Sequence, residues 1–339
     1  MKALVYTGPN ALEFRDVPSP TPGNDEVVVQ VEAVGICGSD MHAFHGHDAR
    51  RPPPLVLGHE AAGHITTGPR AGERVTINPL VVCGTCPACT SGRSHLCPDR
   101  QIISMPPRPG AFAQMVRIPE RNLVTIPDDF PFIHAALAEP VAVSYHAVNT
   151  GARLLDRPLS AARCLVLGGG AIGLAAALVL SMQGAAQVHV AETHAGRRDT
   201  VRRAGRFHCY DPADGVTSGG TAEGEPSDGS IDLVIDAVGA VATRATASRL
   251  VRPGGVIVHA GLLPGMEGFD IRRITLQEII VSGTYCYTHA DFCATVEALS
   301  SGRLGALEWA QARPFDEAIT AFADIDNART SAAKIVLTL

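Results

Sequence analysis

Residues 163–173 read RCLVLGGGAIG, and this stretch decides the fold. A short apolar run leads into Gly168-x-Gly170-x-x-Gly173, and an alanine- and leucine-rich segment follows. A strand, a glycine turn and a helix in this order are typical of dinucleotide-binding folds, because the glycines permit close backbone approach and the helix N-terminus faces the pyrophosphate. The glycine spacing alone would also fit a flexible loop, but apolar segments flank it on both sides. The stretch therefore predicts a nucleotide-binding α/β unit.

Short apolar strands continue to alternate with helical segments from residue 162 to residue 281. Further strands are expected in VHVAE (188–192), DLVIDAVG (232–239) and GGVIVHAG (254–261). Such alternation predicts a doubly wound parallel sheet with helices on both faces. A glycine- and serine-rich segment, 214–229, is expected to form a loop.

The rest of the chain has a different character. Runs rich in β-branched residues, such as DEVVVQVEAVG (25–35), are separated by glycine and proline, and AAKIVLTL (332–339) reads as a final strand. We therefore expect residues 1–145 and 290–339 to form a catalytic domain, and residues 146–289 to form a Rossmann domain.

The second strand of the parallel sheet ends at Glu192, 24 residues after the first glycine of the turn. A carboxylate there accepts hydrogen bonds from the ribose hydroxyls and repels a 2′-phosphate, which favours NAD. Arg197 and Arg198 leave NADP open, because arginine pairs with that phosphate; both could also be exposed at a helix start. The predicted cofactor-binding residues are Gly168, Gly170, Ala171, Ile172, Gly173, Glu192, Arg197 and Val238.

Composition excludes several classes of function. The 339 residues carry a formal net charge of −6, so no basic surface for nucleic acid is expected. The uncharged run 164–188 is long enough to span a membrane, but three consecutive glycines interrupt it and favour a buried strand, turn and helix. No secretory signal is recognisable, and nine cysteines then indicate reduced thiols and a cytoplasmic location.

Four of these cysteines lie in one window, VVCGTCPACTSGRSHLC (81–97). Thiolates three residues apart, with glycine or proline between them, can converge on one cation, and a fourth thiolate closes a tetrahedron. Such a site has no open position and is predicted to hold structural zinc. An iron–sulfur cluster and four separate core thiols are the alternatives. The predicted ligands are Cys83, Cys86, Cys89 and Cys97.

A second group of candidate ligands is spread along the chain: CGSDMH (37–42), GHE (58–60) and Glu139-Pro140. Cys37, His59 and Glu60 would supply one sulfur, one nitrogen and one oxygen, which leaves a fourth position open, as in a catalytic zinc site. A lone cysteine more often packs in a core, and a lone His-Glu pair is more often exposed. More than twenty residues separate them, so spacing alone does not join them.

Seven motifs in a fixed order carry a resemblance over nearly the whole chain: GICGSDMH, VLGHEAAG, GERV, the cysteine window, GAFAQ, AEPVAV and GGGAIG. Together they resemble the zinc-containing medium-chain dehydrogenase/reductase family, within the alcohol dehydrogenase superfamily. Glu60 after His59, with Glu139 before Pro140, is similar to its polyol (sorbitol) dehydrogenase branch. The resemblance implies a GroES-like β-barrel-type catalytic domain beside the Rossmann domain.

The resemblance also implies roles for single residues. Cys37 and His59 would bind a catalytic zinc ion, Glu60 would be a ligand or lie directly behind one, and Glu139 could approach the metal. Two zinc ions per chain, one catalytic and one structural, are then expected. Ser39 and His42 resemble the family's proton relay, although His42 also fits a surface histidine in a histidine-rich loop.

The expected activity is zinc-dependent hydride transfer between a secondary alcohol and NAD, giving the ketone. A polyol, sugar alcohol or sugar acid is the first expectation; a vicinal diol, an amino alcohol or NADP dependence is the alternative. A zinc-free reductase would have no use for both cysteine groups. A non-enzymatic zinc-binding regulator fits neither the acidic charge nor the nucleotide fingerprint.

Two features concern the surroundings of the site. Phe44 and the aromatic stretch GTYCYT (283–288) are expected to line the substrate cleft. A homo-oligomer, either a dimer or a tetramer, is expected, with edge strands such as VIVHAG (256–261) and IIVSGTY (279–285) pairing across a two-fold axis.

Overall fold

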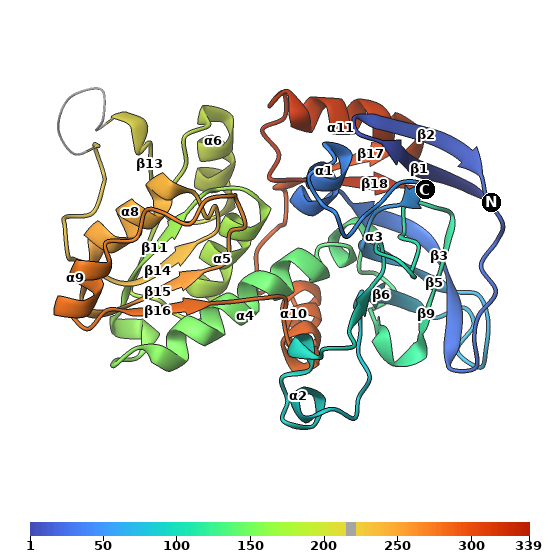
Figure 1. The fold of residues 1–339 in the computed structure, drawn as a ribbon, viewed down its shortest axis with the longest axis horizontal. Coiled ribbons are helices and arrows are strands. Elements are labelled where there is room, and N and C mark those ends of the chain that lie inside the picture. Colours follow the sequence, from blue (N-terminus) through green and yellow to red (C-terminus); the bar gives the residue numbers. More distant parts are fainter. Residues whose placement is uncertain (215–221) are drawn as a thin grey trace.

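The computed structural model describes residues 1–214 and 222–339, and its two halves lie side by side, with helix α4 running below the left half toward the right half (Figure 1). The half drawn on the left contains a six-stranded parallel sheet, and the half on the right contains mainly antiparallel strands. Residues 215–221, part of the predicted loop 214–229, lie outside the described residues.

The parallel sheet confirms the predicted Rossmann fold. Its strands are β11 (Arg163–Leu167), β12 (Gln187–Ala191), β13 (His208–Tyr210), β14 (Ile231–Asp236), β15 (Val251–His259) and β16 (Ile280–Gly283). Their order, β13-β12-β11-β14-β15-β16, places the crossover beside β11, where dinucleotides bind in doubly wound sheets. β15 lies between β14 and β16, so the prediction that its VIVHAG segment is an edge strand is wrong. β16 is the edge.

Side chains of the parallel sheet alternate between its two faces, and helices bury both faces. Val166 packs in the cluster formed with α4 (Ala138–Leu154) and α5 (Ala171–Met182), whereas Leu165 packs on the opposite face with Ala247 of α8 (Val241–Leu250). The helices that complete this half are α6 (Ala195–Ala204), α9 (Ile271–Leu276) and α10 (His289–Ser300).

The other half is built around a seven-stranded mixed sheet. Its strands run in the order β10-β6-β5-β3-β18-β17, with β9 also paired to β3, and have these bounds: β3 (Glu26–Gly35), β5 (Glu60–Ile65), β6 (Arg74–Ile77), β9 (Met115–Pro119), β10 (Leu123–Thr125), β17 (Ala310–Pro314) and β18 (Lys334–Thr338). A three-stranded sheet contains β1 (Lys2–Gly8), β2 (Ala11–Asp16) and β4 (Leu55–Val56), and a two-stranded ribbon contains β7 (Leu80–Val81) and β8 (Gln101–Ile102). β18 thus brings the predicted final strand back to the first half of the chain.

Short helices complete the second half: α1 (Gly38–Phe44), α2 (Pro87–Thr90), α3 (Phe132–Ala135) and α11 (Ala318–Asp326). The described part of the chain also contains four single turns of 3-10 helix: η1 (Ser94–Leu96), η2 (Glu120–Asn122), η3 (Leu159–Ala161), which precedes β11, and η4 (Phe315–Glu317). α4 continues across residue 145, so the division of the chain at 145 and 289 stays a prediction. Within the described residues, no helix is both long and apolar enough to cross a membrane.

Candidate active site and metal centres

Asp40 joins the two loops that carry the predicted catalytic ligands. Its Oδ2 accepts a hydrogen bond from the Cys37 backbone amide (3.0 Å) at the start of α1, and its Oδ1 accepts one from the Gly58 amide (3.2 Å). His59 Nδ1 lies 3.7 Å from Oδ1 of the same carboxylate. Asp40 is fully buried, so these contacts fix its position and leave the other ring nitrogen of His59 available.

The three dispersed candidates meet at one point. One potential ligand atom each from Cys37, His59 and Glu60 lies within 4.8 Å of the others. Glu60 begins β5, and one of its oxygens, Oε1, accepts a 2.7 Å hydrogen bond from Lys334 Nζ. The other, Oε2, is buried without a hydrogen-bond partner. An orphaned carboxylate oxygen beside a thiol and an imidazole fits a bound cation, because a buried polar atom is otherwise expected to be paired.

Gly35 explains why the Glu60 carboxylate can occupy this position. Gly35 of β3 pairs with Glu60 of β5, and a Cβ atom at Gly35 would lie 2.0 Å from Glu60 Oε2. Any side chain there would displace the carboxylate. The local sequence VGICG therefore provides both the thiol and the space for the oxygen ligand.

Glu139, in the first turn of α4, lies beside this group but outside the three-residue cluster. Its Oε1 accepts a hydrogen bond from the Tyr287 hydroxyl (3.1 Å). Burial raises the pKa of Glu139 to about 7, and the Glu60 carboxylate adds to the effect, whereas His59 opposes it. A cation bound at Cys37, His59 and Glu60 would lower this pKa again. The GTYCYT stretch thus contacts Glu139 through Tyr287, but none of its residues lines the cleft beside Cys37.

Phe44 does not line the cleft beside Cys37. Its ring packs 5.7 Å from that of Phe322, against the hydrophobic core of the second half.

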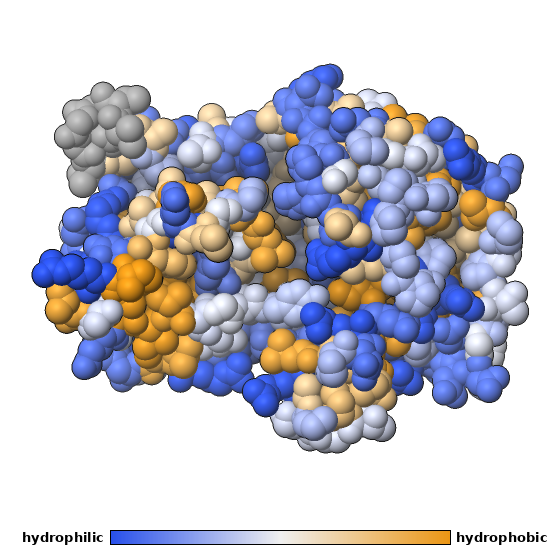
Figure 2. Space-filling model, viewed as in Figure 1, coloured by the Kyte–Doolittle hydropathy of each residue, from blue (hydrophilic) through white to orange (hydrophobic). Residues whose placement is uncertain are grey.

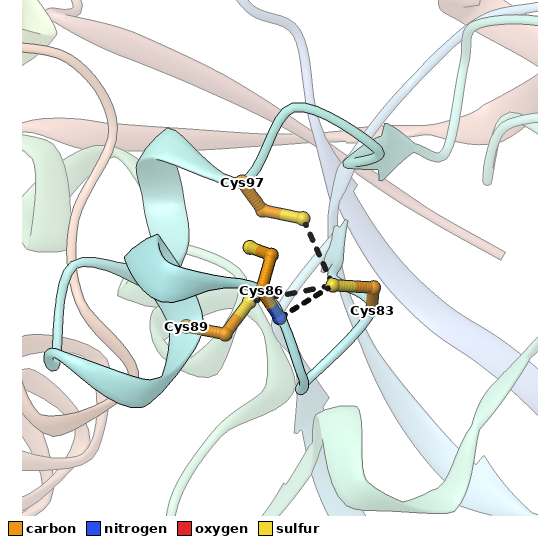
Figure 3. A group of neighbouring side chains, drawn as sticks. All are labelled: Cys83, Cys86, Cys89 and Cys97. Carbon is orange, nitrogen blue, oxygen red and sulfur yellow. Dashed lines mark hydrogen bonds between the residues drawn. The ribbon is translucent and has the colours of Figure 1, made fainter.

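The four-cysteine window folds into a compact lobe in which the sulfur atoms face one another (Figure 3). Cys97 Sγ lies 3.6 Å and Cys89 Sγ lies 3.9 Å from Cys83 Sγ. Four sulfur atoms at about 2.3 Å from one tetrahedral zinc ion would be about 3.8 Å apart, so the spacing fits zinc. Hydrogen bonds from the backbone amides of Thr85 and Cys86 lower the pKa of Cys83 to about 6, which favours the thiolate that a metal needs.

A cleft of about 460 Å³ separates the two halves. The hollow is visible in Figure 2 between the left and right parts of the molecule. Its lining includes Cys37 and His42 on one side, and on the other all the predicted cofactor-binding residues: Gly168, Gly170, Ala171, Ile172, Gly173, Glu192, Arg197 and Val238. Cys37 of the metal group and the glycine turn therefore line one cleft.

The glycine turn is as tight as the motif requires. A Cβ at Gly173 would lie 1.7 Å from the Gly168 carbonyl oxygen, and Gly168 itself has a φ of +96°. Val238 closes over the turn, since a Cβ at Gly168 would lie 2.6 Å from its Cγ2. Buried Asp236 holds that loop by accepting hydrogen bonds from the backbone amides of Val238 and Gly239. Only glycine satisfies these positions.

Glu192 is held firmly at the end of β12. Its two carboxylate oxygens accept hydrogen bonds from the amides of Gly169 (2.8 Å) and His194 (2.7 Å). Arg197 Nε lies 3.9 Å from the same carboxylate, so its charge is partly compensated. Arg198 is turned elsewhere: it pairs with Asp211 and donates to the backbone carbonyls of Glu192 and Thr193. Of the two arginines, only Arg197 lines the cleft.

The predicted relay residues lie on α1, three positions apart and hence on one face of the helix. His42 lines the cleft. Ser39 Oγ lies 3.5 Å from Nη2 of Arg51, whose Nε donates to the Ser104 carbonyl (3.2 Å). The Ser104 hydroxyl in turn lies 3.4 Å from His59 Nδ1. Arg51 therefore links Ser39 to Ser104, whose hydroxyl lies beside His59.

Comparisons with known proteins agree with this geometry. Residues 23–128 match the alcohol dehydrogenase GroES-like domain, and residues 171–301 match the zinc-binding dehydrogenase domain. L-galactonate-5-dehydrogenase of Escherichia coli (strain K12) is 31% identical over 312 residues, which cover 90% of this chain and 89% of that protein. The chain belongs to the zinc-binding alcohol dehydrogenase family. It is therefore an oxidoreductase of the alcohol and polyol dehydrogenase class.

Further members of the family support the assignment. Sorbitol dehydrogenase of Bacillus subtilis (strain 168) is 32% identical over 314 residues, 89% of this chain and 86% of that protein. An alcohol dehydrogenase of Escherichia coli CFT073 complexed with NADH superposes with a TM-score of 0.87 at 26% identity, covering 100% of this chain and 99% of that one. A dehydrogenase of Sinorhizobium meliloti 1021 bound to NADP gives a TM-score of 0.89 at 28% identity, with coverage of 100% and 99%.

Two contacts of the site were not anticipated from the sequence. Tyr287 was expected only to line the cleft, and its hydrogen bond to Glu139 joins residues 148 positions apart. Lys334 was not singled out, although it is the only charged residue in AAKIVLTL. A lone charge in a buried strand needs a partner, and that signal could have identified it.

Proposed function

We propose that this protein is a zinc- and NAD-dependent dehydrogenase that oxidises a secondary alcohol of a polyol or sugar acid to the ketone. The observation that carries the proposal is that one cleft is lined both by Cys37, from the three-residue metal group, and by the glycine turn. The names of the relatives, which include a galactonate and a sorbitol dehydrogenase, support the substrate class.

We assign the catalytic zinc to Cys37, His59 and Glu60, and the structural zinc to the four-cysteine lobe. The catalytic ion would lower the pKa of the substrate hydroxyl, and the nicotinamide would accept the hydride from the carbinol carbon. Asp40 orients His59, and Glu139, held by Tyr287, faces the metal group from α4. Ser39 and His42, on one face of α1, would pass the hydroxyl proton from the site toward solvent.

We assign NAD as the preferred cofactor because the buried Glu192 carboxylate would repel a 2′-phosphate. Arg197, at 3.9 Å, is the group that could favour NADP instead. Kinetics with both cofactors test the assignment: NAD is expected to give the higher kcat/KM, and Glu192→Ala is expected to reduce the preference. A wild-type preference for NADP would overturn it.

The main test combines turnover, cofactor binding and metal content. Sorbitol, gluconate, 2,3-butanediol and L-threonine are assayed by NADH absorbance, and zinc is measured by mass spectrometry. The proposal expects about two zinc ions per chain and turnover of at least one of the first two substrates. Cys37→Ser and His59→Ala are expected to abolish turnover while NADH binding, followed by fluorescence, is retained. Full turnover in either variant would refute the catalytic assignment.

We also propose that the protein forms a homo-oligomer through the β16 edge. Figure 2 shows an apolar area over α9 and β16, which includes exposed Ile271, Leu276, Ile280 and Val281. An unpaired apolar edge strand favours pairing with a second copy. Light scattering after gel filtration is expected to give a dimer or tetramer, and Val281→Asp is expected to give a smaller species. A monomeric wild type would overturn this proposal.

We also propose a cytoplasmic location, because the thiols of the zinc lobe must stay reduced to bind metal.

A further inference from the structure

Three arginines lie near residues that adjoin the metal group. Arg50 and Arg51 come from the loop that follows α1, and Arg100 follows the cysteine lobe (residues 83–97). Arg51 is close to Ser39, and Arg50 and Arg100 are both close to Cys286. The question is what these guanidinium groups bind, because a cation beside a substrate site needs either a protein carboxylate or a ligand to balance it.

Arg100 is tied to the aromatic wall of the site. Its guanidinium lies 5.0 Å from the centre of the Tyr285 ring, and its Nη1 donates to the Cys97 carbonyl (2.9 Å). Tyr285 precedes Cys286, whose pKa is raised to about 12 by burial and by the nearby Glu139 carboxylate. Tyr287 follows and donates to Glu139. Arg100 therefore packs on Tyr285, in the segment whose Tyr287 contacts Glu139 beside the metal group.

Arg51 approaches the same site through its contacts with Ser39 and Ser104 described above. Arg51 is almost completely buried, and its hydrogen bonds hold neighbouring segments of the protein together. Arg50, whose side chain is 61% exposed, shares a single carboxylate with it: Asp48 lies 2.9 Å from Arg50 Nε and 2.5 Å from Arg51 Nη1. Asp48, although partly buried, has its pKa lowered to about 2 by these arginines, so it stays ionised. Arg50 also lies near Tyr285 and Cys286, which contribute to raising its pKa.

Among the described residues, Arg100 is the one arginine of the three that has no carboxylate beside it. Arg50 and Arg51 share Asp48, and Arg51 also lies near the buried carboxylate of Asp40. No ion pair within residues 1–214 and 222–339 includes Arg100, and Arg50 has only its share of Asp48. Deeper in the site, Glu60 is paired with Lys334. Exposed, planar guanidinium groups match the geometry of a carboxylate or phosphate.

We propose that the substrate carries an anionic group, a carboxylate or a phosphate, which Arg100 and Arg50 bind while the alcohol to be oxidised lies at Cys37, His59 and Glu60. This inference rests on the proposed dehydrogenase function and narrows its substrate class. Neutral polyols are then the poorer substrates, because they leave the guanidinium groups without a partner.

The test uses three six-carbon probes at saturating NAD: sorbitol, gluconate and sorbitol 6-phosphate. The measured quantity is the ratio of kcat/KM for each anionic probe to that for sorbitol. At least one ratio is expected to exceed ten, and which one identifies the anion as carboxylate or phosphate. Arg100→Met is expected to lower that ratio tenfold or more. Arg93→Met, which removes an exposed arginine of the cysteine lobe, is the matched control and is expected to leave it unchanged.

A binding measurement separates failure of this inference from failure of the proposed function. Calorimetric titration of gluconate and of sorbitol 6-phosphate into the zinc-loaded protein with NADH needs no turnover, and Arg100→Met is expected to weaken the Kd of the favoured anion tenfold or more. Oxidation of sorbitol without any preference for an anion, or equal binding by Arg100→Met and wild type, would overturn the inference alone. If no probe is oxidised but Arg100-dependent anion binding persists, the proposed function fails and the anion site stands.

Discussion

Replacing Lys334 by methionine is expected to destabilise the metal-free protein far more than the zinc-loaded protein. Lys334 Nζ donates to Glu60 Oε1 (2.7 Å) and to the Ile36 carbonyl (2.9 Å), and the two charged side chains are 3% and 0% exposed. Removing one partner of a buried ion pair costs about 3–5 kcal/mol, because the other charge remains buried without compensation. Without metal, this is the expected loss in the free energy of unfolding.

Zinc changes this cost because it gives the Glu60 carboxylate a second counter-charge. Its Oε2 has no hydrogen-bond partner and is free to coordinate. With zinc bound, the substitution should then cost about 1–2 kcal/mol, the value of the lost hydrogen bonds. The difference of about 2 kcal/mol must appear as zinc binding that is about thirtyfold tighter in the variant.

Urea unfolding, followed by circular dichroism with and without zinc, measures the two losses, and competition with a chromogenic chelator measures zinc affinity. The four-cysteine site is the same in both proteins, so its contribution cancels. Lys334→Arg, which keeps the charge, is the control and should lose less than half as much stability. A loss that is equal with and without zinc, or below about 1 kcal/mol in both states, would refute the reasoning.

Three further predictions test other parts of the structure. Gly35→Ala should displace the Glu60 carboxylate, since the new Cβ would lie 2.0 Å from Oε2, and should lower zinc to about one per chain with loss of turnover; two zinc ions in an active variant would contradict this. Cys97→Ser, at a fully buried position, should remove the other zinc ion and lower the thermal midpoint, and an unchanged midpoint would argue against a structural metal. Burial lowers the pKa of His189 to about 4, so folding favours its neutral form. Stability should therefore fall as pH drops from about 6.5 to 4, by about 3 kcal/mol from this residue. In His189→Phe, urea unfolding across that range should show a correspondingly smaller loss, and an identical pH profile would contradict the assignment.

The sequence predicts the parts of this molecule whose determinants are local. The glycine turn and the four cysteines each lie within about fifteen residues, and their geometry follows from short-range chain constraints. Cys37 and His59, in contrast, were joined only through resemblance to a family, because nothing in their spacing brings them together. Asp40 provides the physical link, since it accepts hydrogen bonds from both loops.

Contacts between distant segments could not be predicted in the same way. The Lys334–Glu60 pair spans 274 positions and depends on β18 pairing with β3, which itself pairs with β5. Strand order caused one clear error: VIVHAG is apolar enough for an edge or an interior strand, and only the neighbours of β15 decide between them. Arg100 gave no signal because its partner, Tyr285, is distant in sequence.

The placement of β18 has a consequence for biosynthesis. On the ribosome, the thiol, imidazole and carboxylate of the metal group emerge long before Lys334, so a nascent chain contains Glu60 without its ammonium partner and β3 without one of its neighbours. A zinc ion captured at that stage would neutralise the carboxylate until translation supplies the lysine. Supply of the metal during synthesis, and not only afterwards, should therefore raise the yield of folded protein.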